Sequence, residues 1–245
     1  MLNRIRKIFT PNLKRKIPFN SYQKFKINDV YPPGIQGDRH IKWIEKNVKE
    51  FAKIIKTKTE PKVILDIGSL NGIESIFLSE FFPNAKIFTF EPNPESFKIV
   101  KFLTNNYQNI KVFNLAASNK NKKNKFYITP NLGTCSILEP IGGPAGNEFE
   151  IIEVLHERID SFALKHNIKV IDAIWMDVQG SESLVLEGMG KLLNTVKVLK
   201  TELGKKSYYK EQTLSNEILS YLKDFKTIKK SYENEWEEDR IFIRN

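Results

Sequence analysis

The chain has 245 residues, of which 40% are hydrophobic and 28% charged, as in an ordinary globular domain with a solvated surface. No apolar run reaches the roughly 18–20 residues that a membrane-spanning helix needs, and the first residues carry too many charges for a secretory signal. The single cysteine, Cys135, excludes an internal disulfide and is typical of a reducing compartment. We interpret it as a partly buried apolar side chain and expect a cytoplasmic protein.

The net charge of +10 is concentrated at the start of the chain, where residues 1–16 contain six basic side chains and no acidic one. Apolar residues recur between these charges at helical spacing, as in a helix that lies at a membrane interface. The segment is therefore interpreted either as a solvated tail or as a peripheral contact with an anionic membrane surface. RNA is a third partner for such a tail, but the excess charge is not spread over the rest of the chain, and we do not expect a nucleic-acid partner.

Residues 1–38 as a whole read as this basic tail followed by an irregular lead-in that contains Pro32, Pro33 and Gly34. Beyond the lead-in, short β-branched runs alternate with helical periodicity, which predicts successive βα units. In chain order we expect a helix at 41–55, a strand at 62–67, a helix around 73–81, a strand at 85–90, a helix that starts at Pro94 and a strand at 110–115.

The middle of the chain, 116–150, is polar and rich in turns. We expect one extra strand there, at 125–128, and interpret the glycine-containing loop 130–148 as a lid. Regular alternation then resumes, with helices expected at 157–166, 182–193 and 214–223 and strands at 170–176, 196–202, 225–230 and 240–244. Alternation of this kind implies parallel strands with right-handed crossovers, so the predicted fold class is α/β, doubly wound, with an antiparallel hairpin at one edge. Residues 39–245 are expected to form a single domain.

The most informative segment is 63–72 (VILDIGSLNG), in which an apolar strand runs into a glycine-containing turn that opens a helix. Backbone amides at such a helix N-terminus bind ligands. A dinucleotide fingerprint needs glycines where Leu70 and Ile73 stand, and no Gly-Lys-Ser/Thr follows, so both NAD and a phosphate-binding loop are disfavoured. Asp66, two residues before Gly68, instead suits a cationic amino group, such as that of S-adenosylmethionine.

Glu91 ends the strand expected at 85–90 and lies 23 residues after Gly68. This is close to the roughly 20-residue spacing at which an acid meets a ribose, whose two hydroxyls a carboxylate accepts. Ala116 and Ala117 are small enough to let an adenine ring approach. Either acid alone is equally well a loop residue or a cap, but two acids at neighbouring strand ends predict an adenosyl cofactor. Residues 62–118 would form the cofactor half and 119–245 the acceptor half.

Asp177 follows the strand expected at 170–176. If that strand neighbours the 62–67 strand, Asp177 faces the transferred methyl group. It would then accept the proton of an acceptor hydroxyl, or bind a divalent cation such as Mg²⁺ with Glu202 as the second ligand. The structural alternatives are a strand-end cap for Asp177 and a loop acid for Glu202. Tyr208 is expected either to stack on a sugar face or to lie at the surface, and His156 is interpreted as a surface histidine.

Four segments resemble the FkbM-type methyltransferases: 66–72 (DIGSLNG), 90–94 (FEPNP), 158–162 (RIDSF) and 176–182 (MDVQGSE). The resemblance implies a Rossmann-like class I fold with a seven-stranded sheet, S-adenosylmethionine as cofactor, and hydroxyls of polyketides or of sugars as acceptors. The segment 36–39 (QGDR) departs from the family, is similar to metal-dependent sugar O-methyltransferases, and is interpreted as a cover over the cofactor. The resemblance implies cofactor contacts at Asp66, Gly68, Asn71, Glu91 and Asn93, and acceptor contacts at Asp177, Gln179 and Glu182. We also expect Ser69 and Pro92, which lie in the same two turns, to contact the cofactor.

The sequence therefore predicts an S-adenosylmethionine-dependent O-methyltransferase that acts on a hydroxyl of a sugar or glycan-type small molecule. One alternative is a nucleic-acid methyltransferase that uses the basic tail, although the Asn-Pro-Pro-Tyr signature of amino-methylating enzymes is missing. Another is an NAD-linked sugar oxidoreductase or epimerase, and a third is a regulatory protein that keeps an inactive cofactor fold.

Overall fold

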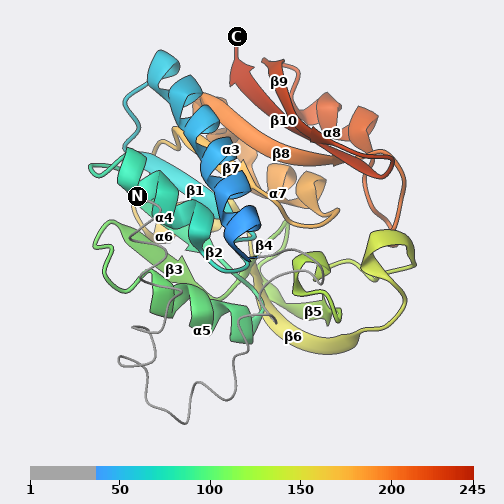
Figure 1. Ribbon diagram of the computed structural model, residues 1–245. Helices are drawn as coiled ribbons and strands as arrows, with labels where there is room; N and C mark the ends of the chain where they lie inside the picture. Colours follow the sequence, from blue (N-terminus) through green and yellow to red (C-terminus); the bar gives the residue numbers. More distant parts are fainter. Residues whose placement is uncertain (1–36) are drawn as a thin grey trace.

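The computed structural model describes the backbone of residues 37–245 and the side chains from Ile41 onward (Figure 1). The predictions about the basic tail at 1–16, about the lead-in up to residue 36 and about Gln36 lie outside these residues. Residues 37–39, predicted as the end of the lead-in and part of a cover segment, are instead the first residues of a helix. No helix in the described part of the chain combines the length and apolar character needed to cross a membrane.

A seven-stranded sheet forms the centre of the molecule, with strand order β3-β2-β1-β7-β8-β10-β9. Its parallel strands are β1 (Val63–Ile67), β2 (Lys86–Phe90), β3 (Ile110–Phe113), β7 (Ala173–Met176) and β8 (Val198–Gly204). The antiparallel hairpin of β9 (Phe225–Glu233) and β10 (Glu237–Arg244) completes one edge, with β10 paired to β8 (Figure 1). The predicted fold class is confirmed. Strand β1 lies between β2 and β7, so the condition on which the placement of Asp177 depends is met.

Helices cover both faces of this sheet, because alternate side chains of each central strand are buried on opposite sides. Ile64 packs on one side with α3 (Gly37–Lys58), α4 (Ile73–Phe81) and the end of α5 (Pro94–Leu103). Leu65 packs on the other side with α6 (Ile159–Lys165), α7 (Glu182–Met189) and α8 (Ser215–Tyr221). The carboxyl ends of the five parallel strands therefore meet at one edge, where ligands bind in sheets of this kind.

Replacing Leu65 by Ala is expected to lower the free energy of unfolding by about 2–5 kcal/mol, because the leucine is fully buried and its loss leaves a cavity. Denaturant unfolding followed by circular dichroism measures this change. Leu164, whose exposed fraction is 81%, provides the matched control. Its replacement by Ala should change stability by less than about 0.5 kcal/mol. An equal loss in both variants would contradict the assignment of Leu65 to the core.

The prediction of one extra strand in the middle of the chain was incomplete. A second, three-stranded sheet is present, with order β4-β6-β5, formed by β4 (Ala116–Ala117), β5 (Lys122–Ile128) and β6 (Glu150–Glu157). Strand β6 was missed because one face is exposed and its polar and apolar residues do not alternate cleanly. The surface assignment of His156 was wrong for the same reason: the residue lies in β6, is buried, and its Nε2 is 3.1 Å from the carbonyl oxygen of Lys125.

Other elements agree with their predicted positions but differ at their ends. Strand β7 starts at Ala173 rather than 170, because Asp172 turns its carboxylate to the backbone amides of Lys62 and Val63 at 2.8 and 3.0 Å. Helix α7 ends at Met189, where Gly190 adopts φ +51° and a 3₁₀ helix follows to Thr195. Helix α3 extends beyond 41–55 at both ends.

Candidate active site

A cavity of about 740 Å³ opens at the carboxyl ends of β1, β2, β7 and β8. The turns after β1, β2 and β7 line it together with Glu202 of β8, and the loop 131–137 with β4 and β5 forms a further wall. Helix α3 and the β9–β10 hairpin close one end through Trp43, Tyr232 and Glu237. Of the predicted site residues, those that line the cavity are Gly68, Ser69, Asn71, Glu91, Pro92, Ala116, Ala117, Asp177, Gln179 and Glu202.

The turn after β1 is tied to both neighbouring strands. The amides of Gly68 and Ser69 donate to the carbonyl of Phe90 at 3.0 and 3.1 Å. Gly68 has φ +83°, and a Cβ atom there would lie 1.7 Å from the carbonyl oxygen of Asp177. This position therefore needs glycine both for its backbone conformation and for the close approach of the β7 end.

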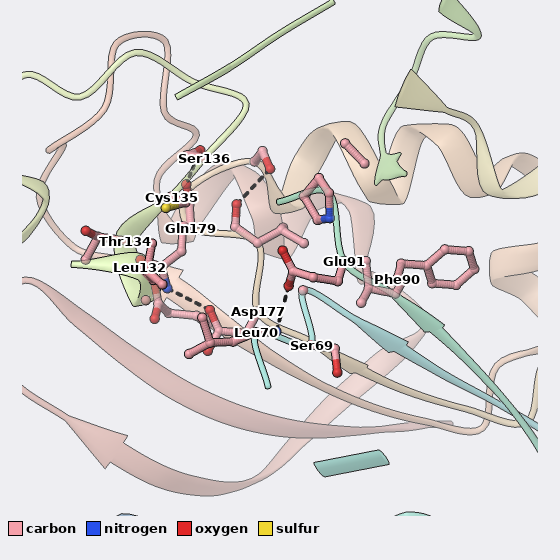
Figure 2. Close-up of a pocket in the computed structure, with 18 of the residues that line it drawn as sticks. Ser69, Leu70, Phe90, Glu91, Leu132, Thr134, Cys135, Ser136, Asp177 and Gln179 are labelled. Carbon is pink, nitrogen blue, oxygen red and sulfur yellow. Dashed lines mark hydrogen bonds between the residues drawn. The ribbon is translucent and has the colours of Figure 1, made fainter. Parts of the chain in front are cut away.

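Glu91, at the end of β2, is held by two backbone amides on the cavity wall (Figure 2). Its carboxylate accepts from the amide of Leu70 at 2.7 Å and from that of Asn93 at 2.9 Å. Burial raises the pKa of Glu91 to about 8, although the two amides oppose this shift. A carboxyl fixed in this way retains acceptor capacity for the hydroxyls of a ribose.

Two predicted cofactor contacts are placed elsewhere. Asp66 points away from the cavity, and its carboxylate accepts from the hydroxyls of Ser69 and Ser75 at 3.0 and 2.5 Å. Burial raises its pKa to about 6. Asn93 caps α5 by accepting from the amide of Glu95 at 3.0 Å and does not line the cavity. Both residues support the turns that hold a ligand rather than contacting the cavity.

Asn71 and Glu74 provide polar groups that suit the amino-acid end of an adenosyl cofactor. Asn71 accepts from the amide of Ile73 at 3.1 Å, but its side-chain NH₂ group is buried without a partner. Because the residue lines the cavity, this donor is available to a ligand carboxylate. Glu74, on α4, also lines the cavity, and burial followed by repulsion from Asp66 raises its pKa to about 8. Sequence reasoning missed Glu74, since it lies one residue beyond the glycine turn in an ordinary helical pattern.

Asp177 lies in the cavity directly after β7, as predicted. Its carboxylate accepts from the side-chain amide of Gln179 at 2.7 Å (Figure 2). Gln179 has φ +52° and is itself contacted by the hydroxyl of Tyr209 at 3.3 Å. The side chain of Asp177 is thereby oriented, with acceptor capacity left for a ligand.

Glu182 was predicted to contact the acceptor, but it lies outside the cavity lining. Its carboxylate faces the amides of Gly180 and Val178 at 3.3 and 3.4 Å and so fixes the loop that carries Gln179. Burial raises the pKa of Glu182 to about 7. Ser181 occupies the N-cap position of α7, yet its hydroxyl donates to the carbonyl of Val178 at 2.9 Å and makes no cap.

Tyr208 was predicted to stack on a sugar or to lie at the surface, and neither is correct. Its exposed fraction is 1%, and it lies behind the cavity wall. Its hydroxyl is 3.0 Å from Glu202 and 2.5 Å from Glu237, both of which line the cavity. Burial, and then repulsion from Asp177, raises the pKa of Glu202 well above its usual value. Tyr208 thus positions the carboxyls of Glu202 on β8 and Glu237 on β10, which are far apart in the sequence.

The predicted Mg²⁺ ion finds no support in this arrangement. Within residues 37–245, no group of three or more His, Cys, Asp or Glu side chains is arranged to hold a metal ion. Asp177 and Glu202 both line the cavity, but no third His, Cys, Asp or Glu among the described residues is arranged with them to hold an ion. We therefore assign no metal ligands.

The strand order, the antiparallel last strand and an acid at the tip of β2 beside a glycine turn define a class I methyltransferase of the Rossmann-like type. Residues 66–228 match the family model described as the methyltransferase FkbM domain, which spans more than half of the chain. The chain belongs to this family and is a methyltransferase that uses S-adenosylmethionine.

The chain is also similar, at lower levels of sequence identity, to individual methyltransferases. The chain is 27% identical over 194 residues to the 2-O-methyltransferase NoeI of Sinorhizobium fredii, covering 74% of this chain and 80% of that protein. The N-terminal domain of EvdMO1, solved with SAH bound, is 10% identical with a TM-score of 0.47, covering 82% of this chain and 80% of that one. The chain spans 40% of the longer EvdMO1 structure. An rRNA methylase from Streptococcus thermophilus is 11% identical with a TM-score of 0.46, covering 81% and 94%.

Proposed function

We propose that the protein transfers a methyl group from S-adenosylmethionine to a hydroxyl of a sugar or glycan-type small molecule. The observation that carries this proposal is the position of Asp177, an oriented carboxylate in the same cavity as Glu91 and the glycine turn. The sequence similarity to a protein named as a 2-O-methyltransferase supports a hydroxyl acceptor.

At the cofactor end, each part of the ligand has a matching group. Glu91 accepts from the ribose hydroxyls, and Ala116 and Ala117 leave room for adenine. Asn71 donates to the carboxylate of the methionine part, and Glu74 receives its ammonium group. When bound, the cofactor would supply a methyl group on a sulfonium: the acceptor oxygen would bond to the methyl carbon as the carbon–sulfur bond breaks in line, and the demethylated thioether would be the leaving group.

At the acceptor end, the protein must orient the hydroxyl and take its proton. Asp177 does both in this proposal: its free acceptor capacity fixes the hydroxyl, and the same carboxylate takes the proton as the new C–O bond forms. Gln179 keeps Asp177 in place through the 2.7 Å hydrogen bond. Glu202 and Glu237 form the wall beyond it.

The direct test is incubation of the full chain with methyl-labelled S-adenosylmethionine and a panel of sugars and oligosaccharides, followed by mass spectrometry to locate the label. Label on a sugar oxygen is the expected result. Label on RNA or protein alone would overturn the proposal. Thermal shifts with S-adenosylmethionine, its demethylated product and NAD separate the oxidoreductase alternative, for which NAD alone would stabilise the protein.

Replacing Glu91 by Gln is expected to weaken cofactor binding about tenfold, because an NH₂ group replaces one of the two acceptor oxygens and a ribose hydroxyl left without its acceptor costs about 1–3 kcal/mol. Isothermal titration with S-adenosylhomocysteine measures the dissociation constant. Glu95→Gln is the control, since Glu95 pairs with Lys98 on the exposed side of α5 and lies outside the cavity lining. Equal affinities for the two variants would exclude Glu91 as the ribose contact.

A further inference from the structure

The charge of the cavity lining is opposite to that of the chain. The net charge of the protein is +10, yet none of the described residues that line the cavity is Lys, Arg or His. Six carboxyl groups line it instead. These are Glu74, Glu91, Asp177, Glu202, Glu237 and Asp239. The cofactor, with two cationic groups and one carboxylate, accounts for the acids near the glycine turn but not for those contributed by β8 and β10.

Among the acids of β8 and β10, Glu202 shares its hydrogen-bond donor, the hydroxyl of Tyr208, with Glu237. The hydroxyl of Tyr208 has a single proton, and it lies closer to Glu237, at 2.5 Å, than to Glu202, at 3.0 Å. Only 7% of Glu202 is exposed, and the hydroxyl of Tyr208 is the one hydrogen-bond partner of its carboxylate among the described residues. A buried carboxyl in this position is costly unless a ligand supplies a donor.

The third acid that β8 and β10 contribute to the cavity, Asp239, is neutralised by an ion pair. Asp239 pairs with Lys200 at 2.8 Å, and Lys200 lies over the ring of Trp175 at 4.8 Å from its centroid. Lys200 itself lies outside the cavity lining, so its charge is not presented to a ligand. Asp177, Glu202 and Glu237 form no ion pair with a basic side chain among the described residues. Burial raises the pKa of Glu202 and Glu237, and a cation bound beside them would favour their ionised form.

Two aromatic rings form the wall beside these acids. Trp43 of α3 and Tyr232 of β9 line the cavity with their ring centroids 6.3 Å apart and their planes nearly perpendicular. Both side chains are partly exposed. Aromatic faces accept the apolar face of a sugar ring, and they also attract an ammonium group.

We propose that the acceptor end of the cavity takes a sugar residue that carries a protonated amino group. This inference rests on the proposed sugar methylation and narrows its substrate class. The ammonium group donates to Glu202 and Glu237, while a neighbouring hydroxyl reaches Asp177. A uronic acid or a phosphorylated sugar finds no cation in the described lining and is repelled by the carboxylates.

The test uses methyl glycosides of glucosamine, N-acetylglucosamine, glucose and glucuronic acid. Two quantities are measured for each: binding in the presence of S-adenosylhomocysteine, and kcat/KM for label transfer. We expect the glucosamine glycoside to be favoured about tenfold or more over the N-acetyl and glucose forms, and the glucuronide to be rejected. Equal or weaker binding of the glucosamine form overturns the inference. Preferential amine binding without transfer to any sugar counts against the proposed function instead.

Glu237→Gln provides the matched variant. Loss of its charge is expected to reduce the preference for the glucosamine over the glucose glycoside about fivefold or more. Glu235→Gln is the control, because Glu235 lies on the same hairpin, pairs with Lys206 and is outside the cavity lining. An unchanged preference in a folded Glu237→Gln protein, checked by its thermal midpoint, contradicts the assignment of this acid to the amine.

Discussion

Replacing Asp177 by Asn is expected to lower kcat for methyl transfer by about 10²–10⁴-fold, the range in which general bases contribute. The substitution keeps the size of the side chain but removes the group that accepts the proton of the acceptor hydroxyl. Cofactor affinity should stay within about twofold, because the predicted cofactor contacts lie on β1, α4, β2 and β4 instead. Single-turnover label transfer and titration with S-adenosylhomocysteine measure the two quantities separately.

The control for this prediction is Asp224→Asn. Asp224 pairs with Arg244 at 3.4 Å on the exposed side of the β9–β10 edge, far from the cavity lining. Its substitution should leave kcat unchanged. If Asp177→Asn retains more than about a tenth of the wild-type kcat, Asp177 does not act as the base.

The parts of the site that the sequence predicts are those fixed by chain geometry. Parallel strands joined by right-handed crossovers have their carboxyl ends at the same edge of the sheet, so Glu91 and Asp177 could both be placed at the edge where the glycine turn lies. The structure has β1 between β2 and β7, as this argument requires. The positions of these strand ends follow from the direction of the strands alone and do not depend on how the side chains pack.

The direction of a side chain at a strand end was harder to predict. Asp66 shares the face of β1 that carries Ile64, which packs against α3 and α4. The alternation places its carboxylate beneath the turn, beside Ser75, and away from the ligand side. Because β1 is buried on both faces, its apolar run gave no signal to distinguish the two directions. The period of two groups Asp66 with Ile64, but only the structure shows that this is the face covered by α4.

Contacts between distant segments left no trace in the sequence. Tyr208 joins Glu202 of β8 to Glu237 of β10 only because the antiparallel hairpin brings residue 237 opposite residue 204. Local sequence could not separate this buried tyrosine from a surface residue that leads into a helix. The acids of β10 were overlooked for the same reason, since they stand in a run of charges typical of a solvated loop.

Replacing Gly68 by Ala is expected to lower the free energy of unfolding by about 2–5 kcal/mol and to abolish measurable cofactor binding. Two independent costs combine here. The left-handed backbone at φ +83° disfavours any side chain, and the new methyl group would lie 1.7 Å from the carbonyl oxygen of Asp177. Because that oxygen belongs to the backbone, it cannot rotate away, and the turn after β1 must separate from the end of β7. This movement displaces both the glycine turn beside the cofactor and Asp177.

Gly146→Ala separates the cost of the backbone conformation from the cost of the steric clash. Gly146 also has a positive φ, +68°, with ψ −166°, but a Cβ atom there meets nothing within 4 Å. It should therefore show only the conformational penalty of about 1–3 kcal/mol and bind S-adenosylhomocysteine normally. Denaturant unfolding and calorimetric titration of both variants measure the difference. If Gly68→Ala loses no more stability than Gly146→Ala and still binds the ligand, the close contact between the β1 turn and the β7 end is not what shapes the cofactor site.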